Sequence, residues 1–123
     1  MPNVRRLVVV SLGFAALAAP AAAHHGWGSY QSGETAVSGV VQTAGLGNPH
    51  GLLKVRDAQG RTWDVMLAPP AAIARSGLTA ELVPAGARIT ADGHRHTDPK
   101  VFEIKTERLT VNGRTFDLYP ARD

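Results

Sequence analysis

Short segments in which polar and apolar residues alternate recur from residue 35 onward, separated by turns rich in glycine and proline. A period of two at this spacing is typical of a small all-β domain. In the last long segment Phe102 and Ile104 share one parity but Leu109 takes the other. This slip of one residue predicts a bulge or bend near Glu107. We therefore expect five strands, at residues 35–43, 52–56, 61–67 and 87–94 and from Phe102 through Val111.

One helix interrupts this row of strands. Pro69-Pro70 is typical of a first helical turn, and Gly77 stands where a left-handed residue ends a helix, so a short helix through Ser76 is expected. Three strands, a helix and two strands is the order of an OB-fold, a partly open five-stranded barrel. An SH3-like barrel is the alternative, but it leaves the helix unexplained. Asn112-Gly113 predicts a hairpin turn near the end of the chain.

The first 23 residues have the pattern of an export signal. Arg5 and Arg6 precede an uncharged apolar run, and Ala21-x-Ala23 supplies small residues at a cleavage site. We expect cleavage after Ala23, a mature chain that begins with His24, and a periplasmic or secreted location.

The mature chain then divides into an arm and one domain. Residues 24–34 are rich in glycine and serine and show no period, so we expect an arm pinned by Trp27 and Tyr30. Residues 35–123 are expected to form a single OB-like barrel domain.

The composition excludes several classes of protein. Without the two signal arginines, 11 basic residues face 10 acidic ones, so the mature chain lacks the charge that nucleic-acid binding needs. No second apolar stretch approaches the roughly 20 residues of a membrane-spanning helix, so no membrane span is expected after processing. The chain has no cysteine, so the domain is held by its own core without disulfides.

The five histidines are the candidate metal ligands. A chain that begins with His24 offers its free amine and its ring to one ion, and His25 adds a second imidazole. Nitrogen donors without thiolates favour Cu(II), Ni(II) or Zn(II), of which Cu(II) is our first expectation. His50 follows Pro49 in the loop between the first two strands, at the rim of the OB ligand-binding face.

His94 and His96 form a weaker pair of candidates. On a strand they lie on one face, about 6.6 Å apart along it, which suits chelation. However, their parity matches that of Arg88 and Thr90, on what we expect to be the solvent side, next to a turn. A solvated hairpin end is therefore the competing interpretation.

Two functions follow, neither of them catalytic. The sequence has no nucleophile elbow, phosphate loop, HExxH motif or cysteine nucleophile, so we expect no enzyme and no catalytic residues. The first hypothesis is a periplasmic Cu(II)-binding protein that uses His24, His25 and His50. The alternative is a non-catalytic periplasmic module whose barrel binds a partner protein or a small ligand.

Several motifs together resemble a known family. They are Ala23-His24-His25, Asn48-Pro49-His50, Trp63-Asp64-Val65, Ala68-Pro69-Pro70, Ser76-Gly77-Leu78-Thr79 and Gly93-His94. The sequence resembles the family catalogued as domain of unknown function 6152 over nearly the whole mature chain. The resemblance implies a periplasmic β-barrel module without assigned chemistry. His24, His25, His50 and His94 match the family pattern, whereas His96 does not, and Gly45-Leu46-Gly47 stands where bulkier residues are expected.

Overall fold

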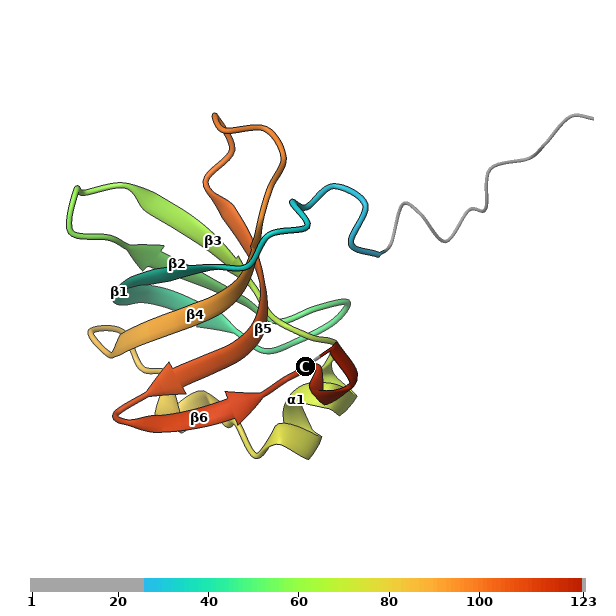
Figure 1. The fold of residues 1–123 in the computed structure, drawn as a ribbon. Helices are drawn as coiled ribbons and strands as arrows, with labels where there is room; N and C mark the ends of the chain where they lie inside the picture. The colour runs from blue at the N-terminus through green and yellow to red at the C-terminus, as the bar shows by residue number, and fades with distance from the viewer. Residues whose placement is uncertain (1–25, 123) are drawn as a thin grey trace, which may run out of the picture.

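The computed structural model describes residues 26–122. Their six strands form one mixed sheet that closes on itself (Figure 1). The predicted cleavage site and both His24 and His25 lie outside the described residues. The strands are β1 (Thr35–Gly45), β2 (Leu52–Arg56), β3 (Thr62–Met66), β4 (Arg88–Arg95), β5 (Glu103–Val111) and β6 (Arg114–Asp117).

The strand order defines an OB-fold. The sheet runs β3-β2-β1-β4-β5-β6, and an additional parallel pairing of β3 with β5 closes the first five strands into a barrel. The long strand β1 belongs to both halves, because its first part pairs with β4 and its second part with β2. The register shifts between Val41 and Thr43, where β1 passes from one partner to the other. The predicted OB-like barrel is confirmed, and the SH3-like alternative is not needed.

The helix α1 (Pro70–Ser76) lies between β3 and β4, as the order of an OB-fold requires. It ends at Gly77, whose φ of 86° is left-handed, as predicted. Ile73 is the buried residue of this helix, and it packs over Gly51, where an added methyl group would meet the Ile73 side chain. The helix thus covers one end of the barrel, and a short 3₁₀ turn, η2 (Ala80–Leu82), leads on to β4.

The apolar residues that alternate along each strand point into the barrel and pack against one another. The buried core includes Val41, Leu53, Val55, Trp63, Val65, Ile73, Ile89, Ala91, Ile104, Leu109 and Phe116. Burial of apolar surface on this scale is the main favourable term in the stability of a small domain without disulfides.

The predicted irregularity in β5 is a bulge at Glu107. Asp92 pairs with Arg108 and Gly93 with Thr106, so Glu107 is the extra residue. Gly93 lies against the backbone of β5 at this point, because a Cβ atom there would collide with the carbonyl of Lys105. Beyond the bulge, Asn112 and Gly113 have φ values of 51° and 75°, which suit the predicted two-residue hairpin that leads to β6. The described chain ends in the 3₁₀ turn η3 (Pro120–Arg122).

Candidate functional site

The arm before β1 is held at the end of β4 by backbone hydrogen bonds. Tyr30 forms an isolated antiparallel bridge with His96, the Gln31 amide donates to the Arg95 carbonyl at 2.8 Å, and the Thr97 amide donates to the Ser29 carbonyl at 2.9 Å. The arm therefore adds short backbone pairing to the open edge of β4.

Trp27 is the anchor of this arm, as predicted. Its ring lies edge-on to the rings of Tyr119, at 5.1 Å, and His94, at 5.5 Å. Arg122 stacks on it with its guanidinium carbon 3.9 Å from the ring centroid, and the Lys105 Nζ lies 4.6 Å from the same centroid. Cation–π contacts of this kind add to the burial of the ring. Trp27 thus joins the arm to β4, β5 and η3.

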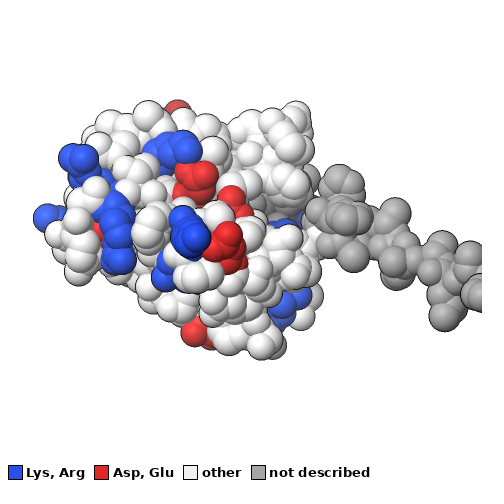
Figure 2. Space-filling view, turned by 90° about the horizontal axis from the view of Figure 1, so that it is seen from above, with Lys and Arg blue, Asp and Glu red and all other residues white. Residues whose placement is uncertain are grey.

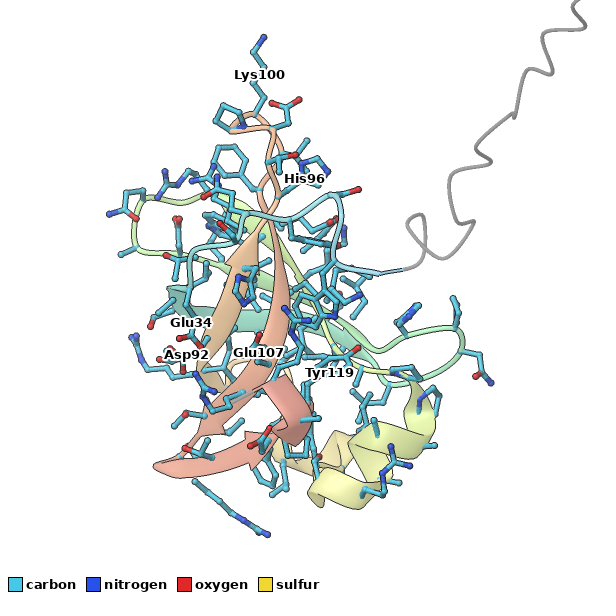
Figure 3. The ribbon with its side chains drawn as sticks, turned by 45° about the vertical axis from the view of Figure 1, so that its right-hand side comes forward. Glu34, Asp92, His96, Lys100, Glu107 and Tyr119 are labelled. Atoms are coloured by element: carbon cyan, nitrogen blue, oxygen red, sulfur yellow. The ribbon has the colours of Figure 1, made fainter. Side chains whose placement is uncertain are left out.

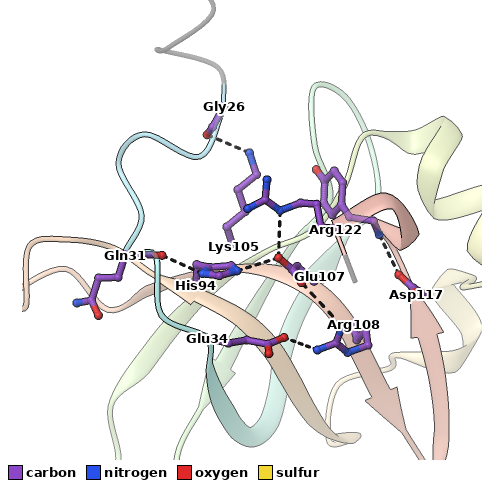
Figure 4. A network of polar contacts seen from close by, with 10 residues as sticks. Gly26, Gln31, Glu34, His94, Lys105, Glu107, Arg108, Asp117 and Arg122 are labelled. Carbon is purple, nitrogen blue, oxygen red and sulfur yellow. Dashed lines mark hydrogen bonds and ion pairs between the residues drawn. The ribbon is translucent and has the colours of Figure 1, made fainter.

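His94 is buried, and its predicted position on the solvent side is wrong. The residue is 8% exposed because the arm and η3 cover the outer face of β4 at this point. Nδ1 lies 2.9 Å from the Gln31 carbonyl oxygen and Nε2 lies 2.8 Å from Glu107 Oε1 (Figure 4). Both ring nitrogens are therefore occupied, and a metal ion at His94 would have to displace one of these partners.

Glu107 is the centre of a buried polar network. The residue is 3% exposed. Its Oε1 also accepts from Arg122 Nε at 3.1 Å, while Oε2 lies 3.8 Å from a guanidinium nitrogen of Arg108. Arg108 continues the network to Glu34 at the end of the arm. A carbonyl oxygen only accepts, so His94 Nδ1 donates to Gln31, and Nε2 faces the Glu107 carboxylate.

His96 lies apart from this network, directly after β4 and beside Tyr30 of the arm (Figure 3). Its Nδ1 accepts from the Asp98 amide at 3.0 Å, and its ring lies edge-on to Tyr30 at 5.9 Å. Because His94 is turned toward Glu107, the two histidines do not share a chelating arrangement. The His96 ring instead lines a cavity.

That cavity of about 220 Å³ brings together two of the predicted histidines. His50 comes from the loop between β1 and β2, and His96 from the end of β4. Gly26, the first described residue of the arm, lines it as well. The remaining walls are Ser29, Tyr30, Met66, Glu103 and Lys105. Loop β1–β2, the end of β4 and the outer face of β3 are the elements that surround ligands in OB-folds.

Three polar groups determine the electrostatics of the cavity. The Tyr30 hydroxyl donates to Glu103 Oε2 at 2.6 Å, and burial together with this carboxylate raises the pKa of Tyr30 well above its usual range. The Lys105 Nζ donates to the Gly26 carbonyl at 3.2 Å. Burial lowers the pKa of Lys105, the Arg122 guanidinium lowers it further, and Glu103 opposes both effects. The cavity is thus polar and contains charges of both signs.

The described residues alone do not complete a metal site. Within residues 26–122 no group of three histidine, cysteine, aspartate or glutamate side chains could hold a metal ion together. The residues before Gly26 lie outside the described part of the chain. His24 and His25 are the two residues that immediately precede it.

Sequence reasoning did not identify Glu103, Lys105 or Glu107 as members of polar sites. Glu103 and Lys105 share the outward parity of β5, which is a usable signal once strand β5 is known. Nothing in the local sequence, however, indicates that the arm covers them. Figure 2 shows that acidic and basic side chains adjoin one another on the face seen there, in keeping with the small net charge. Among the described residues, no helix is long and apolar enough to cross a membrane.

The fold and the site together define a small OB-fold barrel with an arm across the end that carries His50 and His96. Comparison with known proteins gives its family. The model of the Family of unknown function (DUF6152) matches residues 12–104, more than half of the chain, and the protein belongs to this family. No curated protein sequence matches it.

The similarity to solved structures is partial. The crystal structure of the S. pombe Stn1–Ten1 complex contains a chain with 12% sequence identity and a TM-score of 0.47. The match covers 63% of the present chain and 57% of that chain. The assignment of the OB-fold rests on the strand order and on the β3–β5 closure described above.

Proposed function

We propose that this protein is an exported, non-catalytic copper-binding protein that holds Cu(II) between its mature N-terminus and the barrel. The ligands would be the amine and imidazole of His24, the imidazole of His25 and the imidazole of His50. Nitrogen donors of this kind suit Cu(II), which stands highest among the divalent first-row metals in affinity for such sites.

The observation that supports this proposal is the shared cavity of Gly26 and His50. His24 and His25 directly precede Gly26 in the sequence. In Figures 1 and 3 the described end of the arm lies on the same side of the barrel as the β1–β2 loop. A histidine start at this place would add its donors to a cavity that already presents His50.

The proposal predicts a ranking of ligands. With an authentic His24 start, His24→Ala and His50→Gln should each weaken Cu(II) binding in a competition titration. His96→Gln should weaken it less, because His96 lies at the end of β4 and its Nδ1 already accepts from the Asp98 amide. Equal losses for His24→Ala and His96→Gln would refute this ligand set.

The affinity should also depend on pH in a defined direction. An α-amino group titrates near ~7.7–8.0 and an imidazole near ~6.5, and both must lose their protons to bind a metal. Acidification from pH 8 to pH 5 should therefore weaken Cu(II) binding steeply. Binding that stayed constant over this range would point to other ligands.

The alternative function is a barrel that recognises a partner protein or a small ligand without metal. It predicts that Cu(II) binding is weak and indifferent to the N-terminus. The ligand-ranking titration above distinguishes the two functions.

A further inference from the structure

Lys105 is a buried cation without an ion pair among residues 26–122. The residue is 7% exposed, and its ammonium donates to the Gly26 carbonyl at 3.2 Å and lies over the Trp27 ring. An ammonium has three donors, and buried charges are ordinarily paired with an opposite charge. At least one donor of the ammonium therefore has no partner within residues 26–122, and Lys105 lines the wall of the cavity.

Glu103 presents the complementary charge to the same cavity. It precedes Lys105 by two residues on β5, so both side chains leave the same face of the strand, about 7 Å apart along it. Its Oε2 accepts from the Tyr30 hydroxyl, and within the described part of the chain no ion pair joins Glu103 to Lys105. Both side chains line the cavity, and Glu103 is near enough to oppose the lowering of the Lys105 pKa without forming an ion pair with Lys105.

The cavity is small and open to solvent on one side. Its volume of about 220 Å³ is below the roughly 300–1,000 Å³ of pockets for drug-sized ligands. A ligand of only a few heavy atoms fits such a space.

We propose that this cavity binds a small zwitterion of the α-amino acid class, with its carboxylate at Lys105 and its ammonium at Glu103. A simple anion would neutralise Lys105 but would place a second negative charge beside Glu103. A simple amine would do the reverse. A zwitterion satisfies both groups, and its binding needs neither a metal ion nor a free N-terminus, so the inference goes beyond the proposed copper site.

Glycine is the probe that tests this site. Mature protein passed over a chelating resin should bind one equivalent of glycine in isothermal titration calorimetry at pH 7. Acetate and methylamine should each bind at least about tenfold more weakly, the loss expected when one hydrogen bond to a charged group is missing. Lys105→Met and Glu103→Gln should each weaken glycine binding by a similar factor. The exposed positions Lys100 and Glu81 provide matched controls, since Lys100→Met and Glu81→Gln should retain the original affinity.

Three results would overturn the proposal: no heat of glycine binding, acetate binding as tightly as glycine, or unchanged glycine affinity in Lys105→Met. Circular dichroism verifies that the variants fold. If Lys105→Met does not fold, the glycine affinity of Glu103→Gln alone tests the proposal. A protein with one extra N-terminal glycine residue should lose the proposed copper site but retain glycine binding. The two proposals therefore fail separately.

Discussion

His94 Nε2 lies 2.8 Å from Glu107 Oε1, and both residues are more than nine-tenths buried. The pair joins the last regular part of β4 to the bulge in β5, and Gln31 of the arm completes it from the other side of the imidazole. Through Gln31, the pair also connects the arm to the barrel, so this contact links the arm, β4 and β5.

Removing the charge of Glu107 should destabilise the fold. Glu107→Gln preserves the shape of the side chain but weakens the acceptor that His94 and Arg122 use. We expect the free energy of unfolding to fall by about 2 kcal/mol, the scale of a hydrogen bond to a charged group. Denaturant unfolding measures this loss. Glu81→Gln on the exposed η2 turn is the control and should stay within about 0.5 kcal/mol.

Truncation of Trp27 should release the arm while the barrel stays folded. Trp27→Ala removes the ring contacts with Tyr119 and His94 and the stacking of Arg122. Hydrogen exchange at the amides of Gln31 and Thr97, which bond across the junction of arm and barrel, should accelerate. Amides in the middle of β2 serve as the internal reference. Unchanged protection at Gln31 would show that the backbone bridge alone holds the arm.

Gly93 is required by the close approach of β4 and β5. Gly93→Ala would direct a methyl group at the Lys105 carbonyl, so either the bulge or the strand pairing must shift. We expect a loss of about 1–3 kcal/mol in the free energy of unfolding, as for other overpacked sites. Gly45→Ala is the matched control, because a methyl group at this strand position meets no atom within 4 Å. Equal stability of the two variants would contradict the described register.

Asp57 should titrate at unusually low pH. Burial tends to raise the pKa of this carboxyl group, but hydrogen bonds from Trp63 Nε1, the Arg61 amide and the Arg61 side chain outweigh it and lower the pKa to about 2. The unfolded-state pKa is near ~3.9. A carboxyl group with a depressed folded-state pKa contributes stability above its unfolded-state pKa, and this contribution is lost as the pH falls from about 4 to about 2. NMR titration of Asp57 tests the value, and Asp57→Asn should flatten the acid limb of the stability curve.

The fold was predictable because its signals are local. Alternation within each strand, Pro69-Pro70 and Gly77 around α1, and the change of parity before Leu109 all lie within a few residues of the feature that they predict. The order of these elements then leaves few ways to close a barrel. The bulge at Glu107 follows from the same local reasoning.

The candidate site was predictable only in part, because its contacts span long distances in sequence. The position of His50 at the rim follows from the OB order, and His50 does line the cavity. The burial of His94 depends on Gln31, 63 residues away, and on the covering Trp27 ring. The alternation of polar and apolar residues along β4 does not indicate that an arm and a C-terminal turn cover its polar face. Lys105 was missed for the same reason.

The most direct test of the copper proposal is a Cu(II) titration of protein that begins with His24, compared with protein that carries one extra N-terminal glycine. Electron paramagnetic resonance reports the ligands in both. We predict that the His24 start binds one equivalent much more tightly, with a distinct spectrum rich in nitrogen ligands. If both proteins bind Cu(II) alike and weakly, the N-terminal histidine does not form a metal site, and the proposed function is wrong.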